Sequence, residues 1–194
     1  DIDGNIYNTI KVGGRTWMIE NLKVTHYQNG DEIPTGYNDS EWNQLETGAY
    51  AIYNNDSDYF NIFGNLYNFH ATIDERNICP ENWRIPEAWH DLTEFPFDSL
   101  AGGKMKEPGH DNWLYYSNDI TGQATNETGF NGLPGGIRNF GGYMDVGKIG
   151  YFAGKHITDD LYSINLSYNN SHTYYNPTML TDGVSIRCIT GKIR

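Results

Sequence analysis

Side chains that could carry out catalysis are thinly spread in this 194-residue chain. An enzyme needs a positioned nucleophile, base or metal ion. The sequence has no H-E-x-x-H zinc motif, no G-x-S-x-G nucleophile motif, no phosphate-binding loop and no C-x-x-C pair. Asp159 and Asp160 are adjacent carboxylates, but a glycosidase needs its carboxylates at a defined separation, which a sequence does not show. The histidines occur singly, at His26, His70, His90, His110, His156 and His172. The pattern favours a protein that is not an enzyme.

Two short stretches carry oxygen ligands of the kind that calcium binds. Residues 107–109 read EPG and residues 117–119 read SND. They are similar to the Glu-Pro-Asn and Trp-Asn-Asp motifs of calcium-dependent sugar-binding lectins. Calcium takes six or more oxygen ligands, and Gly109 stands where the motif needs a side-chain oxygen. We therefore do not expect calcium-dependent sugar binding at these residues.

Asn126 and Glu127, in ATNETGF, are the remaining candidates for calcium ligands. The opening DIDGN is similar to the start of a calcium-binding loop, but the third acidic ligand and the closing glutamate are missing. We interpret DIDGN as a turn. The sequence predicts no cofactor, with a structural calcium ion at Asn126 and Glu127 as the alternative.

The charge of the chain excludes some partners. Its 13 Lys and Arg residues are scattered among 25 Asp and Glu residues, which gives a net charge of −12. Nucleic acids and anionic lipid surfaces require clustered basic residues, so neither is an expected partner. No run of about eighteen apolar residues occurs, so no transmembrane span is expected.

Aromatic residues are the most promising binding groups, because their rings stack on sugars or hold peptide side chains. We expect about half of the candidates to be core residues instead. In a strand, adjacent tyrosines point to opposite faces, so one of Tyr115 and Tyr116, and one of Tyr174 and Tyr175, should point inward. The ligand-binding candidates are Trp113, Tyr115, Tyr116, Tyr143, Tyr151, Phe152, Tyr174 and Tyr175.

The pattern of apolar residues in the first half predicts short elements joined by polar turns. Residues 5–22 read as a hairpin around Gly13 and Gly14, and residues 49–55 read as a strand. Residues 64–73 read as a short helix, because Leu66, Phe69 and Ile73 recur at helical spacing.

A second helix is predicted over residues 86–95, beginning at Pro86 and ending before Pro96. Ala88, Trp89, Leu92 and Phe95 would share one of its faces. A long functional loop region is expected at residues 100–150. Strands are predicted at residues 150–155, 161–170, 172–176 and 184–190. The pattern indicates an α+β fold with antiparallel sheets, one or two short helices, and a single domain spanning residues 1–194.

The chain has two cysteines, Cys79 ahead of the second predicted helix and Cys188 in the last predicted strand. They form either a disulfide or a pair of buried thiols. A disulfide would close a loop of roughly 110 residues and stabilise the fold by about 4–5 kcal/mol in the chain-entropy model. It would also indicate an oxidising compartment.

Blocks of sequence along nearly the whole chain resemble the Fibrobacter succinogenes major paralogous domain, which is found in secreted and surface proteins, often lipoproteins, of Bacteroidetes and Fibrobacter. The resemblance implies a C-type lectin-like fold in which the N- and C-terminal strands pair, and this makes a Cys79–Cys188 disulfide sensible. The blocks include DIDGNIYNTIKVGGRTWMIENLKVTHYQNGDEIP, GAYAIYNND, GNLYNFHATI, ICPENWRIPEAWHDL, AGGKMKE, ATNETGFNGLPGGIR and VSIRCIT.

One block departs from the family pattern. Residues 150–158 read GYFAGKHIT where family members usually have G-Y-W-W-S-S-T, so a ligand role of that patch is not carried over. The WRIPEAW and VSIRC blocks are also similar to the formylglycine-generating enzymes. Those enzymes use paired active-site cysteines, and this chain has none beyond the two already described.

The combined reading is a non-enzymatic recognition domain of a bacterial lipoprotein, at the outer-membrane surface or outside the cell. Its expected ligand is a glycan, a peptide or a partner protein, and one version is an accessory subunit of an outer-membrane nutrient importer. A lipid anchor would have to lie outside the printed residues. The alternatives are an enzyme of the formylglycine-generating or hydrolase type, and a structural or adhesive module. A pocket that gathers two carboxylates, or a histidine with an acid, would favour the enzyme.

Overall fold

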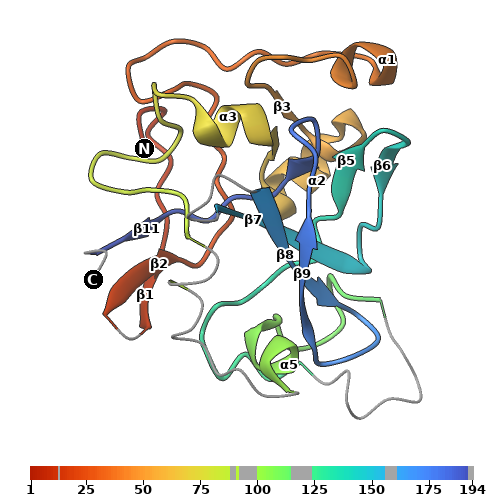
Figure 1. The fold of residues 1–194 in the computed structure, drawn as a ribbon. Helices are drawn as coiled ribbons and strands as arrows, with labels where there is room; N and C mark the ends of the chain where they lie inside the picture. Colours follow the sequence, from red (N-terminus) through yellow and green to blue (C-terminus); the bar gives the residue numbers. More distant parts are fainter. Residues whose placement is uncertain (13, 88–90, 92–99, 115–123, 156–160, 192–194) are drawn as a thin grey trace.

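The computed structural model of the chain describes residues 1–12, 14–87, 91, 100–114, 124–155 and 161–191 (Figure 1). The helices are α1 (Asp39–Trp42), η1 (Tyr53–Asn55), α2 (Ser57–Phe63), α3 (Phe69–Ile73) and α5 (Ala101–Met105). The strands are β1 (Thr9–Val12), β2 (Arg15–Met18), β3 (Tyr50–Ala51), β4 (Leu66–Asn68), β5 (Ile137–Asn139), β6 (Gly142–Met144), β7 (Ile149–Lys155), β8 (Leu161–Ser167), β9 (Thr173–Pro177), β10 (Gly183–Val184) and β11 (Ile189–Thr190). The α+β class with antiparallel sheets is confirmed. The helices are short, as expected, but more than two are present.

The first sheet, in the order β1-β2-β11, joins the two ends of the described chain. The predicted hairpin is present, with Val12 opposite Arg15 across the turn. Ile189 of β11 lies opposite Trp17 of β2, and the backbone N–H of Met18 donates to the carbonyl of Cys188. The expected pairing of the terminal strands is therefore confirmed.

The second sheet has the order β3-β4-β10-β5-β6. It corrects the prediction of one strand over residues 184–190, because Val184 belongs to β10 and Ile189 to β11. Between them, Ser185 exchanges backbone hydrogen bonds with Tyr151 and Ala153 of β7. These contacts carry the chain from one sheet to another, which local sequence does not encode.

Two predictions near β3 and β4 are wrong in part. Leu66 lies in a strand rather than a helix, and α3 begins only after Asn68, whose side chain accepts from the backbone N–H of Ala71 at 3.1 Å. This amide caps the helix, so a strand and a helix share the segment read as one helix. The strand at 49–55 ends at Ala51, since Asn54 and Asn55 adopt positive φ in η1.

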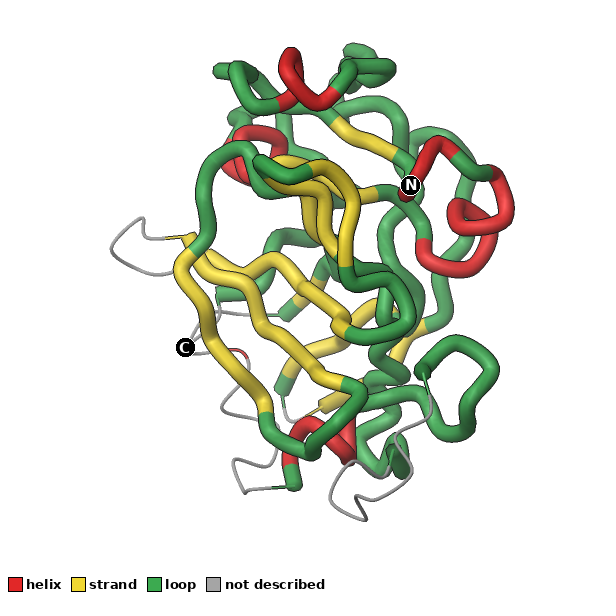
Figure 2. Tube along the Cα trace, turned by 90° about the vertical axis from the view of Figure 1, so that its right-hand side faces the viewer, coloured by secondary structure: helices red, strands yellow, loops and turns green. Residues whose placement is uncertain are grey.

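The third sheet, β7-β8-β9, contains the longest strands and confirms three predicted strands and the hairpin turn between β8 and β9. Figure 2 shows its strands running side by side. The segment read as a long loop, residues 100–150, also holds α5, β5 and β6, so it is partly regular. The predicted helix at 86–95 lies largely outside the described residues, including Ala88, Trp89, Leu92 and Phe95.

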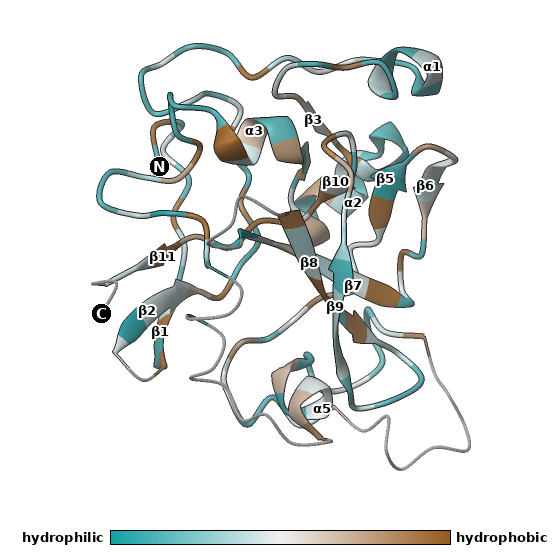
Figure 3. Cartoon of the chain, viewed as in Figure 1, coloured by the Kyte–Doolittle hydropathy of each residue, from teal (hydrophilic) through white to brown (hydrophobic). Residues whose placement is uncertain are grey.

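Two main groups of buried apolar side chains join the sheets. The first includes Leu22, Tyr67 and Ile186, and the second includes Trp17 and Phe152. Hydrophobic residues colour parts of β7, β8 and α3 in Figure 3, while most connecting segments are hydrophilic. The first group lies beneath the segments that form the site described next.

Candidate functional site

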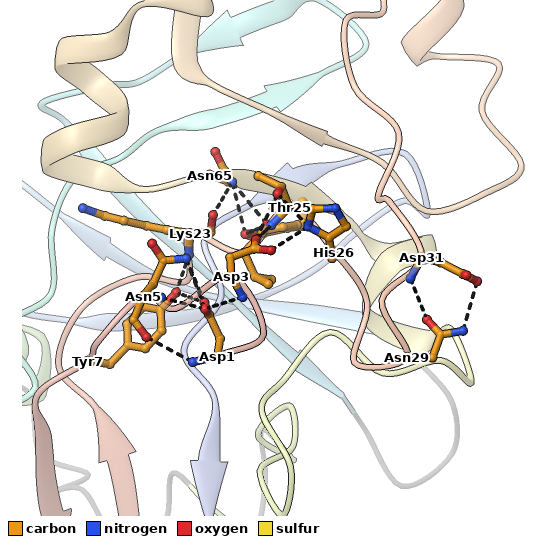
Figure 4. Close-up of polar contacts among 12 residues, drawn as sticks. Asp1, Asp3, Asn5, Tyr7, Lys23, Thr25, His26, Asn29, Asp31 and Asn65 are labelled. Atoms are coloured by element: carbon orange, nitrogen blue, oxygen red, sulfur yellow. Dashed lines mark hydrogen bonds and ion pairs between the residues drawn. The ribbon is translucent and has the colours of Figure 1, made fainter.

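A polar clamp holds the opening segment of the chain against residues 23–26 (Figure 4). The Asp3 carboxylate accepts from the backbone N–H of Thr25 at 2.5 Å and from its hydroxyl at 2.9 Å. The other Asp3 oxygen lies 2.5 Å from Nδ1 of His26. Burial acts to raise the pKa of Asp3, but the hydrogen bonds from Thr25 and His26 outweigh it, so the pKa lies below its ordinary value. The clamp is therefore built on an ionised carboxylate.

Asp1 and Tyr7 extend the clamp. The Asp1 carboxylate accepts from the Tyr7 hydroxyl at 2.6 Å and from the backbone N–H of Asn5 at 2.9 Å. The Tyr7 oxygen in turn accepts from the backbone N–H of Lys23 at 2.9 Å. Burial raises the pKa of the Tyr7 phenol to about 12, so it remains a neutral donor near neutral pH. This network fixes the direction of the Asp1 carboxylate.

The far side of the 23–26 segment is tied to β4. The Tyr67 hydroxyl donates to the carbonyl of Val24 at 2.7 Å, and the Asn65 amide donates to the carbonyl of Lys23 at 3.1 Å. Tyr67 and Asn65 are both fully buried. Because both donors are buried, the clamp is anchored on the core rather than on a surface loop.

A second wall is formed by residues 78–81. Cys79 and Cys188 form a disulfide with a Cα–Cα distance of 5.8 Å, which confirms the pairing expected from the sequence. The Asn77 side chain accepts from the backbone N–H of Cys79 at 3.0 Å, and its carbonyl accepts from the backbone N–H of Gln28 at 2.8 Å. The wall is thus joined both to the last strand and to the segment after the clamp.

A cleft of about 420 Å³ lies between the two walls. Its volume falls in the range of small-ligand sites. The apolar side chains of Ile2, Val24, Ile78 and Pro80 contribute to its lining. The remaining lining residues are Asp1, His26, Gln28, Cys79 and Glu81. Val24 and Ile78 are at most 2% exposed, so the accessible aliphatic surface comes from Ile2 and Pro80, beside two carboxylates and one imidazole.

His26 brings the only imidazole of this lining into contact with an acid, as a hydrolase would require. In a Ser-His-Asp triad, however, the acid and the nucleophile contact opposite ring nitrogens. Here Asp3 and the Thr25 hydroxyl, at 3.1 Å, both approach Nδ1. The arrangement orients the ring but does not form a triad.

The structure divides the predicted aromatic residues between the core and the surface. Trp113 and Phe152 are 4% and 2% exposed and offer no ring face to solvent. The Tyr151 hydroxyl donates to Asp145 at 2.9 Å, and Tyr143 lies against Arg138.

Tyr174 is exposed and Tyr175 is half-buried, which agrees with the expected alternation. Tyr115 and Tyr116 lie outside the described residues. None of the aromatic candidates that the structure describes lines the cleft, so the ligand-binding role of the set stays a prediction.

The calcium candidates have other contacts. The side chains of Asn126 and Asn131 bond one another at 3.2 Å, and the Glu127 carboxylate lies 3.9 Å from Nζ of Lys104. Across the described residues, no cluster of three or more His, Cys, Asp or Glu side chains is placed to hold a metal ion. The calcium hypothesis stays untested.

Sequence reasoning missed the cleft. The predicted DIDGN turn is confirmed, because the backbone N–H of Gly4 donates to the carbonyl of Asp1 at 3.1 Å. The contribution of this turn to the polar clamp is not predicted, because Asp3 contacts Thr25 and His26, which lie 22 or more positions away in the sequence. The two aspartates of DIDGN indicate a polar site, but the sequence does not indicate that Asp3 contacts Thr25 and His26.

A model of the Fibrobacter succinogenes major domain matches residues 10–190 of the chain. The chain belongs to this family. The matched range covers the disulfide and most of the cleft lining, whereas Asp1 and Ile2 lie before it.

No curated protein and no solved structure matches the chain, so the C-type lectin-like fold of this family member stays a prediction. Among the described helices, none has the length and apolar character needed to cross a bilayer.

Proposed function

We propose that this family member is a non-enzymatic recognition domain whose cleft binds an extended peptide segment of a ligand or partner protein. The observation that carries the proposal is the cleft itself, with both walls held in place before any ligand arrives. Preorganised walls favour binding, because little side-chain and loop freedom is lost when the complex forms.

The lining favours a peptide over a glycan. Sugar rings are usually held by stacking on aromatic faces. The residues that line this cleft include no Phe, Tyr or Trp. Aliphatic surface beside hydrogen-bonding groups matches the side chains and backbone of a peptide.

The proposed setting is the surface of a bacterial cell, with the domain as part of a lipoprotein. The support is the family, together with a disulfide of the kind that persists in oxidising compartments. One version is an accessory subunit of an outer-membrane nutrient importer, in which the cleft would hold either a nutrient peptide or a segment of the transporter.

A hydrolase is the second candidate, because His26 contacts Asp3 at the cleft. A general base also needs a nucleophile or a bound water and a group that stabilises the developing charge. The described lining residues include no Ser, Cys, Thr or Lys nucleophile other than the disulfide-bonded Cys79. Binding is therefore the better-supported function.

A peptide array probed with the purified domain, beside a glycan array, tests this proposal. Gln28→Trp should fill the cleft and abolish peptide capture, whereas Gln44→Trp, at an exposed position on another part of the surface, should leave it unchanged. Capture that survives Gln28→Trp, or capture of glycans alone, would contradict a peptide-binding cleft. An adhesive module without ligand would show no capture on either array.

A further inference from the structure

We propose that the outer edge of β1 pairs with β1 of a second copy of this chain, so that the β1-β2-β11 sheets of the two copies join into one. The pairing is independent of the peptide-binding cleft, because the described lining of the cleft contains no residue of β1. It depends on three properties of this edge, which are its unpaired backbone groups, its apolar centre and the charges beside it.

The outer edge of β1 carries backbone groups that no other strand uses. Among the described residues, β1 pairs only with β2. The backbone N–H of Ile19, just after β2, donates to the carbonyl of Asn8, so the backbone groups of Asn8 face β2. Because successive residues of a strand direct these groups to opposite sides, the N–H and C=O groups of Thr9 and Lys11 point away from β2. Such groups are a template for another strand.

The edge has little of the protection that edge strands usually carry. A proline, a bulge or an inward-pointing charge would hinder pairing with another chain. Residues 9–12 read TIKV and pair with β2 in continuous register, and their one charged residue, Lys11, is exposed. The strand is short, so we expect a weak and reversible contact.

Antiparallel pairing about a two-fold axis at Ile10 uses every outward group of the edge. Thr9 of each copy then lies opposite Lys11 of the other, and the residues of each pair exchange both of their backbone hydrogen bonds. The two Ile10 side chains meet at the axis, where paired strands approach most closely. Ile10 is half-buried and packs against the second group of buried side chains, so the contact extends an existing apolar surface.

The charges beside the edge favour a second copy over an unrelated strand. Glu20 accepts from the backbone N–H of Asn8 at 2.8 Å and from its side-chain amide at 2.7 Å, so its carboxylate lies beside the residue that precedes Thr9. Lys11 of the second copy, opposite Thr9, therefore comes next to Glu20, and the two-fold axis forms this ion pair twice. Each copy has a net charge of −12, so two such pairs oppose the repulsion between the copies.

Sedimentation velocity of the whole chain, from about 10 µM to about 1 mM, tests the pairing. We expect a monomer–dimer equilibrium with a dissociation constant of about 0.1 mM, because the contact is small. Unfolding measurements at low micromolar concentration therefore report on the monomer.

Two charge variants test for a second copy as the partner. Lys11→Glu and Glu20→Lys should each weaken dimerisation about tenfold, since each places like charges together at both ends of the contact. An equimolar mixture of the two variants should dimerise like the original protein, because both ion pairs of the mixed dimer again join opposite charges.

A backbone variant tests the edge without changing its charge. Thr9→Pro removes a donor that points away from β2, so it should abolish the dimer while the dilute protein melts like the original. Thr9→Val keeps this donor and should leave the dissociation constant unchanged.

Several results would overturn the proposal. These are an original protein that stays monomeric at about 1 mM, a dimer that survives Thr9→Pro, and a mixture of the charge variants that stays monomeric although both variants melt like the original. If Glu20→Lys disturbs the hairpin through Asn8, the comparison of Thr9→Pro with Thr9→Val decides alone.

Discussion

Charged side chains serve opposite purposes in two regions of the molecule, the cleft and the second group of buried residues around Trp113, Phe130 and Phe152. In the latter, Lys106 is 1% exposed and donates to the carbonyls of Ser167 and Asn170, both at 2.8 Å. Arg187 is equally buried, and it bonds Asn21 at 2.9 Å and the carbonyls of Phe130 and Asn131. In the cleft, by contrast, Glu81 is exposed and makes no side-chain hydrogen bond or ion pair among the described residues.

The difference separates scaffold from site. A buried cation whose N–H groups all donate to protein carbonyls has no donor left for a ligand. Its removal leaves those carbonyls buried without a hydrogen-bond donor. Arg187 also lies 4.3 Å from the centre of the Phe130 ring, so its contacts join separate segments of the core. A carboxylate such as Glu81, at the edge of an open cleft, retains that capacity.

Removing the disulfide should have the largest effect, because it links the cleft wall to the strand that follows Arg187. We expect the Cys79→Ala/Cys188→Ala double variant to lose about 4–5 kcal/mol of unfolding free energy, since the bond closes a loop of more than a hundred residues. Urea unfolding of the oxidised protein and of the variant measures the difference. A loss below about 1 kcal/mol would mean that the cleft wall is held without the bond.

Arg187→Met tests whether the buried cation stabilises the core. We expect a loss of about 3 kcal/mol, because the carbonyls of Phe130 and Asn131 and the Asn21 amide lose their donor while buried. Lys11→Met, at an exposed position, serves as the matched control and should unfold like the original protein. Equal stability of the two variants in urea would remove the distinction between the regions.

Asp3→Asn tests the site side, and its effect should be smaller. We expect a loss of about 1 kcal/mol at pH 7, since the carboxylate side chain is 18% exposed and its bonds are partly screened. The Asp3 pKa is lowered by folding, so its contribution is present above the unfolded value near 3.8 and disappears as the pH falls through the lowered folded value.

Thermal unfolding of the protein and of Asp3→Asn at pH 7 and pH 2 measures this dependence. The gap between the two melting temperatures should narrow in acid. A gap that stays constant would show that the charge of Asp3 does not support the clamp.

The smallest effect is spectroscopic. Burial raises the pKa of Tyr7, Tyr27 and Tyr175 to about 12, while exposed tyrosines ionise near 10. Because folding raises these values, the stability they contribute is present below pH 10 and is lost as the pH rises through about 12. Absorbance at 295 nm should show a late group of phenols, and Tyr7→Phe should remove one of them. A single transition near pH 10 would show that Tyr7 does not remain buried in the clamp.

The sequence predicted those parts of the fold that depend on neighbours in the chain. The first hairpin and β7, β8 and β9 follow from local alternation and turn residues. The division of residues 184–190 between two sheets does not, because the contacts of Ser185 with β7 decide it.

The candidate site was harder to predict, for the same reason. The sequence alone does not show whether an aromatic residue is buried or exposed, so it offers Trp113 as a ligand contact. In the structure Trp113 is buried, with Nζ of Lys106 5.4 Å from the centre of its ring. His26 was read as an isolated residue because Asp3 approaches it only after folding.

The β1-β2-β11 sheet has a consequence for synthesis in the cell. Trp17 can pair with Ile189 only after the whole segment between them has been synthesised. Contacts between such distant positions form slowly, and until they form the edge of β2 is open to other chains. A chaperone that shields this hairpin, or an oxidant that joins Cys79 to Cys188 as soon as both have been synthesised, would therefore raise the yield of correctly folded domain.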